Sequence, residues 1–342
     1  MSATAADPLP RPDRWHRPLV LFAASMVVLA VVAAVAAVID QRQITGAGVW
    51  LKPLKFAVSG AIYTLTLAWL IGQVRRGRRV ADRAGTWVVV ALSIEILLIF
   101  ALAAAAETSH FNISTPWHTT VWAIMAASIA LVWVMTLLIA IAVVRNPGPD
   151  PARTFAARSG IILALIGLGL GFLMTLPTAG QLDDFQGIVG AHAVGVPDGG
   201  PGLPLLGWST TGGDLRIPHF IGMHALQVIP LALVGLELLG RRFRSLSTRR
   251  ARLQALTVAV AVFTATLVTV TVQALSGQSI VRPTGGILIA GALIAFGGLG
   301  ALAEIVRRNA RSPRPDETEE LQWRHAPIPS RHSRQAPRFR RR

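Results

Sequence analysis

The apolar residues of this chain gather in long blocks and are not spread at helical or strand periods. Eight blocks reach the roughly 20 residues that a helix needs to cross a hydrocarbon core about 30 Å thick. Inside lipid, only a helix satisfies the backbone hydrogen bonds of such a segment. We therefore predict an all-α polytopic membrane helix bundle, with spans near residues 18–39, 53–74, 86–106, 117–144, 159–178, 218–239, 254–276 and 284–306.

The positive charges predict how this bundle is oriented. Arg and Lys concentrate in the short cytoplasmic loops of membrane proteins. With the N-terminus inside, 28 of the 33 Lys and Arg residues fall in inner segments. Because adding or removing one span would scramble this division, we predict eight spans in the inner (plasma) membrane, with both termini cytoplasmic. The outer segments keep only Arg42, Lys52, Lys55, Arg216 and Arg282.

Composition narrows the classes of function. A net charge of +16 would suggest a nucleic-acid partner in a soluble chain, but here it comes from cytoplasmic arginines, so we predict anionic lipid and no nucleic acid. The absence of cysteine excludes disulfides, iron–sulfur clusters and cysteine nucleophiles. The abundant Ala, Val and Arg with only two Lys are typical of a high-GC bacterial genome. Residues 1–17 form a basic N-terminal segment, and residues 307–342, rich in Arg and Pro, are predicted to be disordered.

The first span has an alternative interpretation as a cleaved signal peptide. A basic segment precedes it, and residues 34–36 read Ala-Val-Ala. The apolar stretch of residues 18–39 is longer than the roughly 7–15 residues of a signal sequence. The length favours an uncleaved span.

The polar chemistry of the predicted spans and loops concentrates on the outer side. No histidine falls in the inner half of any span. Five of the eight histidines lie in outer loops or the outer halves of spans, namely His110, His118, His192, His219 and His224. The outer carboxylates are Asp40, Glu107, Asp183, Asp184, Asp198 and Asp214.

Two pairs of ionisable residues suggest a functional site. Glu107 and His110 would share one face if the helix of span three continues through them. The Glu-x-x-His spacing also occurs in di-iron bundles, which need a second copy that this chain lacks. Glu95 is the only carboxylate at mid-membrane depth, and Lys55 is the nearest cation by estimated depth. Glu95 is either a structural partner of a neighbour or a proton-relay or substrate group.

The long external loop of residues 179–217, rich in Gly and Pro, is predicted to be a lid. It holds ten glycines, and residues 191–202 are too broken for a regular element. Loops of this length are usually functional or disordered, and apolar residues such as Trp208 favour packing. We expect the loop to cover the outer ends of spans three, four and six through His192, Asp198 and Asp214, with His192 near His110 or His219.

Three functions are weighed. In the first, Glu95, Glu107, His110 and His224 line one outward-facing polar cavity that binds or transports a small solute. His224 would lie about 9 Å inside the membrane, where an ionisable group usually faces a cavity or the bundle interior. In the second, His110, His219 and His224 hold haem or copper, since imidazole suits both metals. In the third, the chain is an accessory membrane protein without a ligand. No enzymatic activity is assigned.

Two segments carry a resemblance. The run His110-Phe111-Asn112 and the block Gly-Gly-Asp-Leu-Arg…His-Phe…Gly-Met-His-Ala-Leu-Gln of residues 212–227 resemble segments of bacterial multi-pass membrane proteins of unassigned role. The resemblance covers most of the spans. It implies no ligand, substrate or catalytic residue.

The orientation is testable with reporter insertions. A reporter fused after Arg342 and one inserted between Arg76 and Arg83 should both be cytoplasmic, because the positive charges hold these segments inside. A reporter inserted near Gly200 should be external. Alkaline phosphatase and a fluorescent protein, which are active on opposite sides, make the measurement. A cytoplasmic Gly200 reporter would refute the eight-span topology.

Overall fold

The computed structural model of the chain describes residues 12–44 and 46–310. Within them the fold is all-helical, and eight helices are long and apolar enough to cross a membrane, as the sequence predicts. These helices are α1 (Arg17–Ile39), α2 (Leu51–Gln73), α3 (Arg78–Ala104), α4 (Pro116–Val144), α5 (Pro151–Leu170), α7 (Arg216–Arg242), α8 (Arg249–Leu275) and α9 (Gly285–Ala310). Their orientation relative to the two sides of a membrane stays a prediction.

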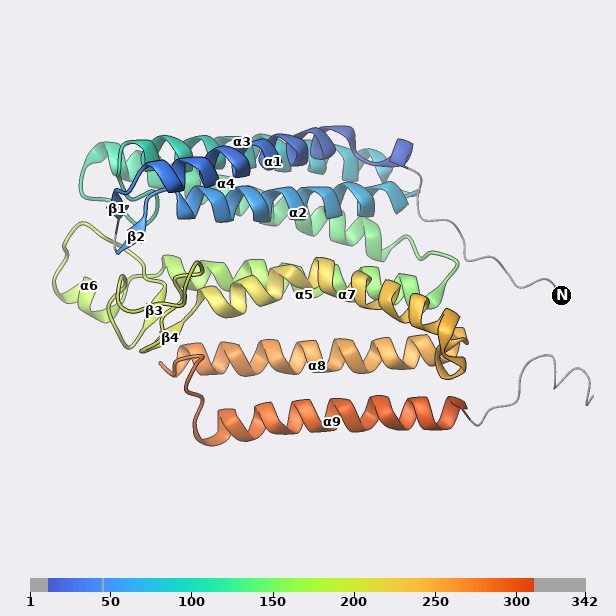
Figure 1. Ribbon diagram of the computed structural model, residues 1–342. Coiled ribbons are helices and arrows are strands. Elements are labelled where there is room, and N and C mark those ends of the chain that lie inside the picture. The colour runs from blue at the N-terminus through green and yellow to red at the C-terminus, as the bar shows by residue number, and fades with distance from the viewer. Residues whose placement is uncertain (1–11, 45, 311–342) are drawn as a thin grey trace, which may run out of the picture.

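Short elements complete the chain and gather mostly at one end of the helices (Figure 1). They are η1 (Pro12–Arg14), η2 (Gly171–Thr175), α6 (Ala179–Asp183), η3 (Arg244–Leu246) and the strands β1 (Gln43–Ile44), β2 (Ala47–Gly48), β3 (Ala193–Val194) and β4 (Gly213–Asp214). Two antiparallel pairs form, β1 with β2 and β3 with β4. The prediction that residues 191–202 hold no regular element is therefore wrong at Ala193–Val194, because the second half of the loop returns to pair there.

The helices extend beyond several predicted spans, because polar turns continue them outside the apolar segment. Helix α3 begins at Arg78, which pairs with Asp82 one turn later. Helix α5 begins after Asp150, whose side chain accepts hydrogen bonds from two backbone N–H groups of the first turn. Helix α9 continues to Ala310, so the first four residues of the predicted tail are helical. Residues 1–11 of the N-terminal segment and 311–342 of the tail lie outside the described residues.

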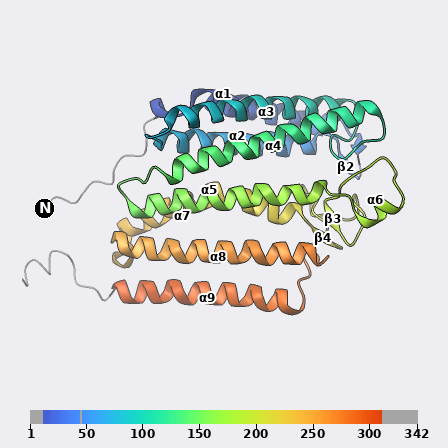
Figure 2. The same cartoon turned by 180° about the vertical axis from the view of Figure 1, so that it is seen from behind.

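The helices pack in two groups that meet along α4 and α5. Helices α1 to α4 form one group; α5, α7 and α8 form the other, and α9 packs against α8 and η3. Figure 2 shows α4 running obliquely toward α5. One apolar core joins α2, α3, α4 and α5 through Leu67, Val88, Ile139 and Ile161. The contact between α4 and α5 therefore links the two halves of the bundle.

Large apolar side chains cover the outside of the described helices. Ile39, Phe296, Leu293 and Leu97 are each about 70% exposed or more, and α9 buries no residue. Such a surface would drive aggregation in water but suits contact with lipid chains. The eight helices are thus compatible with an integral membrane protein.

The tightest helix contact joins α5 to α7 at two glycines. A Cβ atom built on Gly222 would lie 2.4 Å from the Cα atom of Gly167, closer than non-bonded carbon atoms approach in real structures. One residue in α5 and one in α7 must therefore lack a side chain, which lets the backbones approach, as in other membrane helix pairs. The contact holds the start of α7 in place.

We expect Gly222→Ala to destabilise the protein by about 3 kcal/mol, because the new methyl group must push α5 and α7 apart. Thermal unfolding of the purified protein in detergent, followed by tryptophan fluorescence, measures the effect. Gly235→Ala is the matched control in the same helix, since a Cβ there meets nothing within 4 Å. It should gain about 0.5–1 kcal/mol from helix propensity. Equal behaviour of the two variants would contradict the close contact.

Candidate functional site

Glu95 is a carboxylate enclosed in the helix bundle. It lies nine residues before the end of α3 at Ala104, which is about 14 Å along the helix at 1.5 Å per residue. Its side chain is 1% exposed, and neither carboxylate oxygen has a hydrogen-bond partner. An ion in such a place loses several kcal/mol of hydration, which neighbouring charges have to offset.

Two side chains from other segments act on this carboxylate, one as a near neighbour and one through its charge. His110 Nε2 lies 3.4 Å from Glu95 Oε1, at ion-pair distance but without the angles of a hydrogen bond. Lys52, in the first turn of α2, acts on Glu95 through its charge. The amine of Lys52 and the hydroxyl of Ser109 each lie 3.0 Å from His110 Nδ1. We call Lys52, Glu95, Ser109 and His110 the Glu95 cluster.

The environment keeps the imidazole of His110 neutral. Burial lowers its pKa well below the usual value, and the charges of Lys52 and His192 act in the same direction. A lysine ammonium can only donate, so Nδ1 of the neutral ring accepts and Nε2 carries the hydrogen. We assign this tautomer from the hydrogen-bond network. His110 then presents an N–H to Glu95 on one side and a lone pair to Lys52 on the other.

The connection between α3 and α4 folds back into the bundle and so delivers His110. Helix α3 ends at Ala104, and both Ala106 and Phe111 adopt left-handed backbone conformations, with φ of 57° and 68°. A helix that continues through Glu107 and His110, the condition under which the two residues would share one face, is therefore not present. Glu107 turns the other way, and its Oε2 lies 3.1 Å from His118 Nε2.

Aromatic rings surround His110. The rings of Phe56, Trp122 and Phe111 have centroids 5.9, 5.5 and 6.1 Å from the imidazole. They come from α2, α4 and the α3–α4 connection. Apolar walls of this kind exclude water and lower the local dielectric constant, which strengthens the interaction between the charges of the Glu95 cluster.

The loop between α5 and α7 packs on the α3–α4 connection that carries His110. His192 packs on Phe111 with ring centroids 4.9 Å apart, and its Nδ1 lies 2.8 Å from Asp198 Oδ2. Burial lowers the pKa of His192. Burial also opposes ionisation of Asp198, but the hydrogen bonds from the side chain and backbone of His192 and from the backbone of Ala193 lower its pKa to about 2. The loop also pairs with the α3–α4 connection, where the N–H of Val189 donates to the carbonyl of Phe111.

A second charged pair fixes the end of this loop. Asp214 is 1% exposed, and its Oδ2 lies 2.6 Å from a guanidinium nitrogen of Arg216. The backbone N–H of Ser209 donates to the same carboxylate. Of the residues predicted for a lid, His192 therefore contacts the α3–α4 connection, whereas Asp198 and Asp214 tie the loop to itself and to α7. Their role as a lid stays a prediction.

The other predicted site residues lie in separate contact groups. His219 Nδ1 lies 2.8 Å from the carbonyl oxygen of Gly167, at the glycine contact of α5 and α7. His224 Nδ1 lies 3.3 Å from Gln227 Oε1, and Gln227 donates to Thr66 of α2. The structure thus brings His110 to Glu95, and places Glu107 and His224 with other partners. One cavity joining all four stays a prediction.

The residues predicted to hold haem or copper do not form a ligand set. Among the described residues, no three His, Asp or Glu side chains come together in a way that could hold a metal ion. His110, His219 and His224 each have a different polar partner. Their role as ligands of haem or copper stays a prediction.

Lys52 is the site residue that sequence reasoning missed. The sequence pointed to Lys55 as the cation nearest Glu95, but the Lys55 amine donates to the backbone carbonyl of Leu206. The depth of each residue in the membrane was estimated from its position along a straight helix. That estimate could not include the α3–α4 connection, which folds inward and brings His110 beside Lys52. The available signal was that the only two lysines of the chain lie together at the start of α2.

Comparison with protein-family models, with curated proteins and with solved structures finds no match for the chain. Only the eight long apolar helices therefore indicate the class of the protein, and they are compatible with an integral membrane protein. The chemistry of the Glu95 cluster is the guide to function.

We expect Lys52→Met to destabilise the protein by about 3 kcal/mol, because it leaves the Glu95 carboxylate buried without its cation. Adding Glu95→Gln should restore most of this loss, since the second change removes the unpaired charge. Thermal unfolding of the two single variants and the double variant measures the coupling. Lys55→Met is the control and should change stability by less than about 1 kcal/mol. Additive effects of the two changes would show that Lys52 and Glu95 are not partners.

Proposed function

We propose that this chain is a multi-pass inner-membrane protein, with both termini cytoplasmic, that binds or transports a small polar solute at the Glu95 cluster. The observation that carries the proposal is the enclosed Glu95 carboxylate, whose two oxygens lack hydrogen-bond partners. Buried polar groups in native proteins nearly always have partners, and exceptions often belong to functional sites. An ionisable group at this depth in a membrane points to the same interpretation.

The chemistry of the cluster limits the ligand class. Two carboxylate oxygens without partners accept hydrogen bonds, so the ligand carries N–H or O–H groups. The rings of Phe56 and Trp122 offer apolar walls beside His110, the neighbour of those oxygens. A small amine, amino acid or polyol meets both requirements, with its donors on Glu95 and its carbon skeleton against the rings.

The arrangement of His110 also suits proton movement. Its imidazole lies between a proton donor, Lys52, and a proton acceptor, Glu95. A proton accepted at Nδ1 and another released from Nε2 would carry charge from Lys52 to Glu95 without moving either side chain. Protonation of Glu95 removes its attraction for a ligand's donors. In the proposed cycle the proton and the solute therefore compete for the same carboxylate.

In the proposed function, access to Glu95 involves movement of the α5–α7 loop. His192 packs on Phe111, and the Glu95 side chain beside His110 is 1% exposed. Opening would separate these rings and release the backbone pairing of the loop with the α3–α4 connection. The Asp214–Arg216 pair would keep the far end of the loop attached to α7. We infer that the loop pivots there as a lid.

A thermal-stability screen tests the proposed function. The purified protein is heated with amino acids, small amines, polyols and sugars, each at millimolar concentration, and tryptophan fluorescence reports unfolding. A ligand at 100 times its Kd stabilises the folded state by about 2.7 kcal/mol. We expect at least one compound to do so with the wild-type protein and not with Glu95→Gln.

The control is Glu107→Gln, which removes the carboxylate of the neighbouring His118 pair and should keep the full ligand response. A compound that stabilises wild-type and Glu95→Gln protein equally would place the ligand elsewhere. If no compound of these classes stabilises the wild-type protein, the accessory function without a ligand is favoured. Glu95→Gln itself should fold and insert, because the amide keeps the shape of the carboxylate and removes a buried charge.

A further inference from the structure

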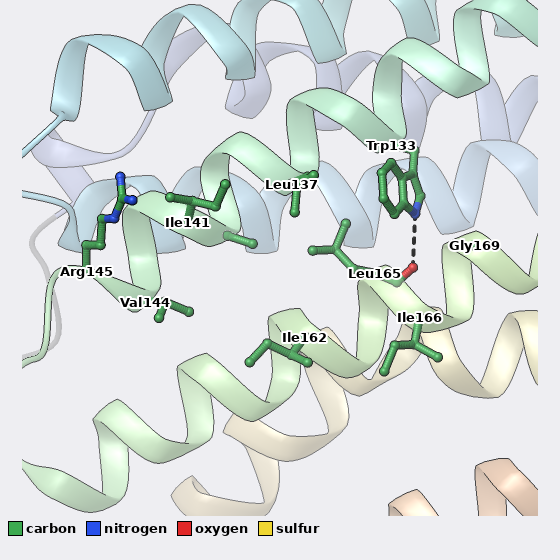
Figure 3. Close-up of a pocket in the computed structure, with 10 residues that line it drawn as sticks. Trp133, Leu137, Ile141, Val144, Arg145, Ile162, Leu165, Ile166 and Gly169 are labelled. Atoms are coloured by element: carbon green, nitrogen blue, oxygen red, sulfur yellow. Dashed lines mark hydrogen bonds between the residues drawn. The ribbon is translucent and has the colours of Figure 1, made fainter.

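A recess of about 570 Å³ lies between α4 and α5, on the outside of the bundle. Figure 3 shows apolar side chains between Arg145 at one end and Trp133 at the other. Its lining residues recur at helical spacing on one face of each helix, through Leu137 and Ile141 in α4 and Ile162 and Ile166 in α5. The recess is therefore a groove that follows the two helices.

Both ends of the groove are closed by side chains that bridge the helices. At one end the indole N–H of Trp133 donates to the carbonyl of Leu165, across 3.1 Å. At the other end a guanidinium nitrogen of Arg158 donates to the carbonyl of Val144, across 2.7 Å. Trp133 and Arg145 are twelve residues apart, which is about 18 Å along α4. One leaflet of a hydrocarbon core is about 15 Å thick, so the groove has the length of a single leaflet.

Two arginines at the Val144 end of the groove have N–H groups without a hydrogen-bond partner among the described residues. Arg145 is exposed, and its guanidinium group has no hydrogen bond or ion pair among the described residues. Arg158 lies four residues before Ile162, on the same face of α5, and its Nε is buried without a partner. A guanidinium group matches the geometry of phosphate oxygens. The end of the groove therefore offers positive charge and free N–H groups where an anionic headgroup would lie.

We propose that this groove binds one anionic phospholipid, with an acyl chain between α4 and α5 and the phosphate at Arg145 and Arg158. Water does not fill an apolar recess, and a void would forfeit the contacts of its walls. An acyl chain fills it at no polar cost. Ile141, Ile162 and Ile166 are 37–50% exposed, so the groove opens sideways toward lipid. The proposal is independent of the Glu95 cluster, which lies toward the other end of the helices.

Lipid retention on the purified full-length protein tests this proposal. The protein is stripped of lipid in detergent, incubated with dioleoyl phosphatidylglycerol or dioleoyl phosphatidylcholine, and examined by native mass spectrometry. We expect one phosphatidylglycerol molecule per chain. At about 1 kcal/mol for each arginine near the phosphate, the preference over phosphatidylcholine should be about 5-fold per arginine. Equal retention of the two lipids would overturn the headgroup assignment.

Two variants locate the lipid. Ile166→Trp fills the open groove and should abolish retention, whereas Ile289→Trp, on the exposed surface of α9, should not. Arg145→Gln should lose about 5-fold of the headgroup preference, whereas Arg79→Gln, another exposed arginine at the same end of the helices, should keep it. Retention by Ile166→Trp equal to that of Ile289→Trp would overturn the proposal, as would an equal loss in Arg79→Gln and Arg145→Gln.

Quenching of tryptophan fluorescence gives a second readout of lipid binding. Phosphatidylglycerol with dibrominated acyl chains quenches a tryptophan that its chain touches. One equivalent should quench the wild-type protein more than Trp133→Phe, because Trp133 lies at the far end of the groove. Quenching that is equal in wild type and Trp133→Phe would show that no chain occupies the groove.

Discussion

The burial of the Glu95 carboxyl group constrains the end of the bundle at which α2 begins and α3 ends. A carboxylate about 14 Å along α3 from the helix end at Ala104 is tolerated only if positive charge and polar hydrogens reach it. Lys52 can do so because α2 begins beside the cluster. His110 can do so because two residues with positive φ turn the α3–α4 connection inward. The left-handed conformation costs about 1 kcal/mol or more at a residue with a side chain. The connection that brings His110 to Glu95 therefore carries backbone strain.

The same contact couples the two halves of the molecule. The inward connection exposes the backbone of Phe111 and Ile113, and the α5–α7 loop satisfies it by pairing with residues 187–189. His192 then packs on Phe111, while the loop is tied to α7 through Asp214. A displacement of His110 would therefore reach the loop through one ring and two hydrogen bonds. Because the loop ends at α7, such a displacement could also reach the opposite half of the bundle.

The sequence predicted the helices better than the site. Long apolar blocks determine the spans. Differences of eight residues arise at the starts of α3 and α5, where polar turns continue the helix beyond the apolar stretch, and at the end of α5, where η2 replaces the helix after Leu170. Glu95 and His110 could be singled out because ionisable groups are rare at their depth. Their partner Lys52 could not be chosen over Lys55, because the two lysines lie one turn apart on the same helix. The sequence also could not show that the backbone turns at Ala106, so it left open whether Glu107 and His110 share a face.

Helix α7 contacts α5 and α2 in different ways. Helices α5 and α7 touch backbone to backbone at Gly167 and Gly222, so they cannot slide without a clash. The polar link from Gln227 of α7 to Thr66 of α2 is a single hydrogen bond of 3.2 Å between flexible side chains. Breaking it costs about 1 kcal/mol, far less than separating the glycine contact. Helix α7 is therefore held more tightly to α5 than to α2.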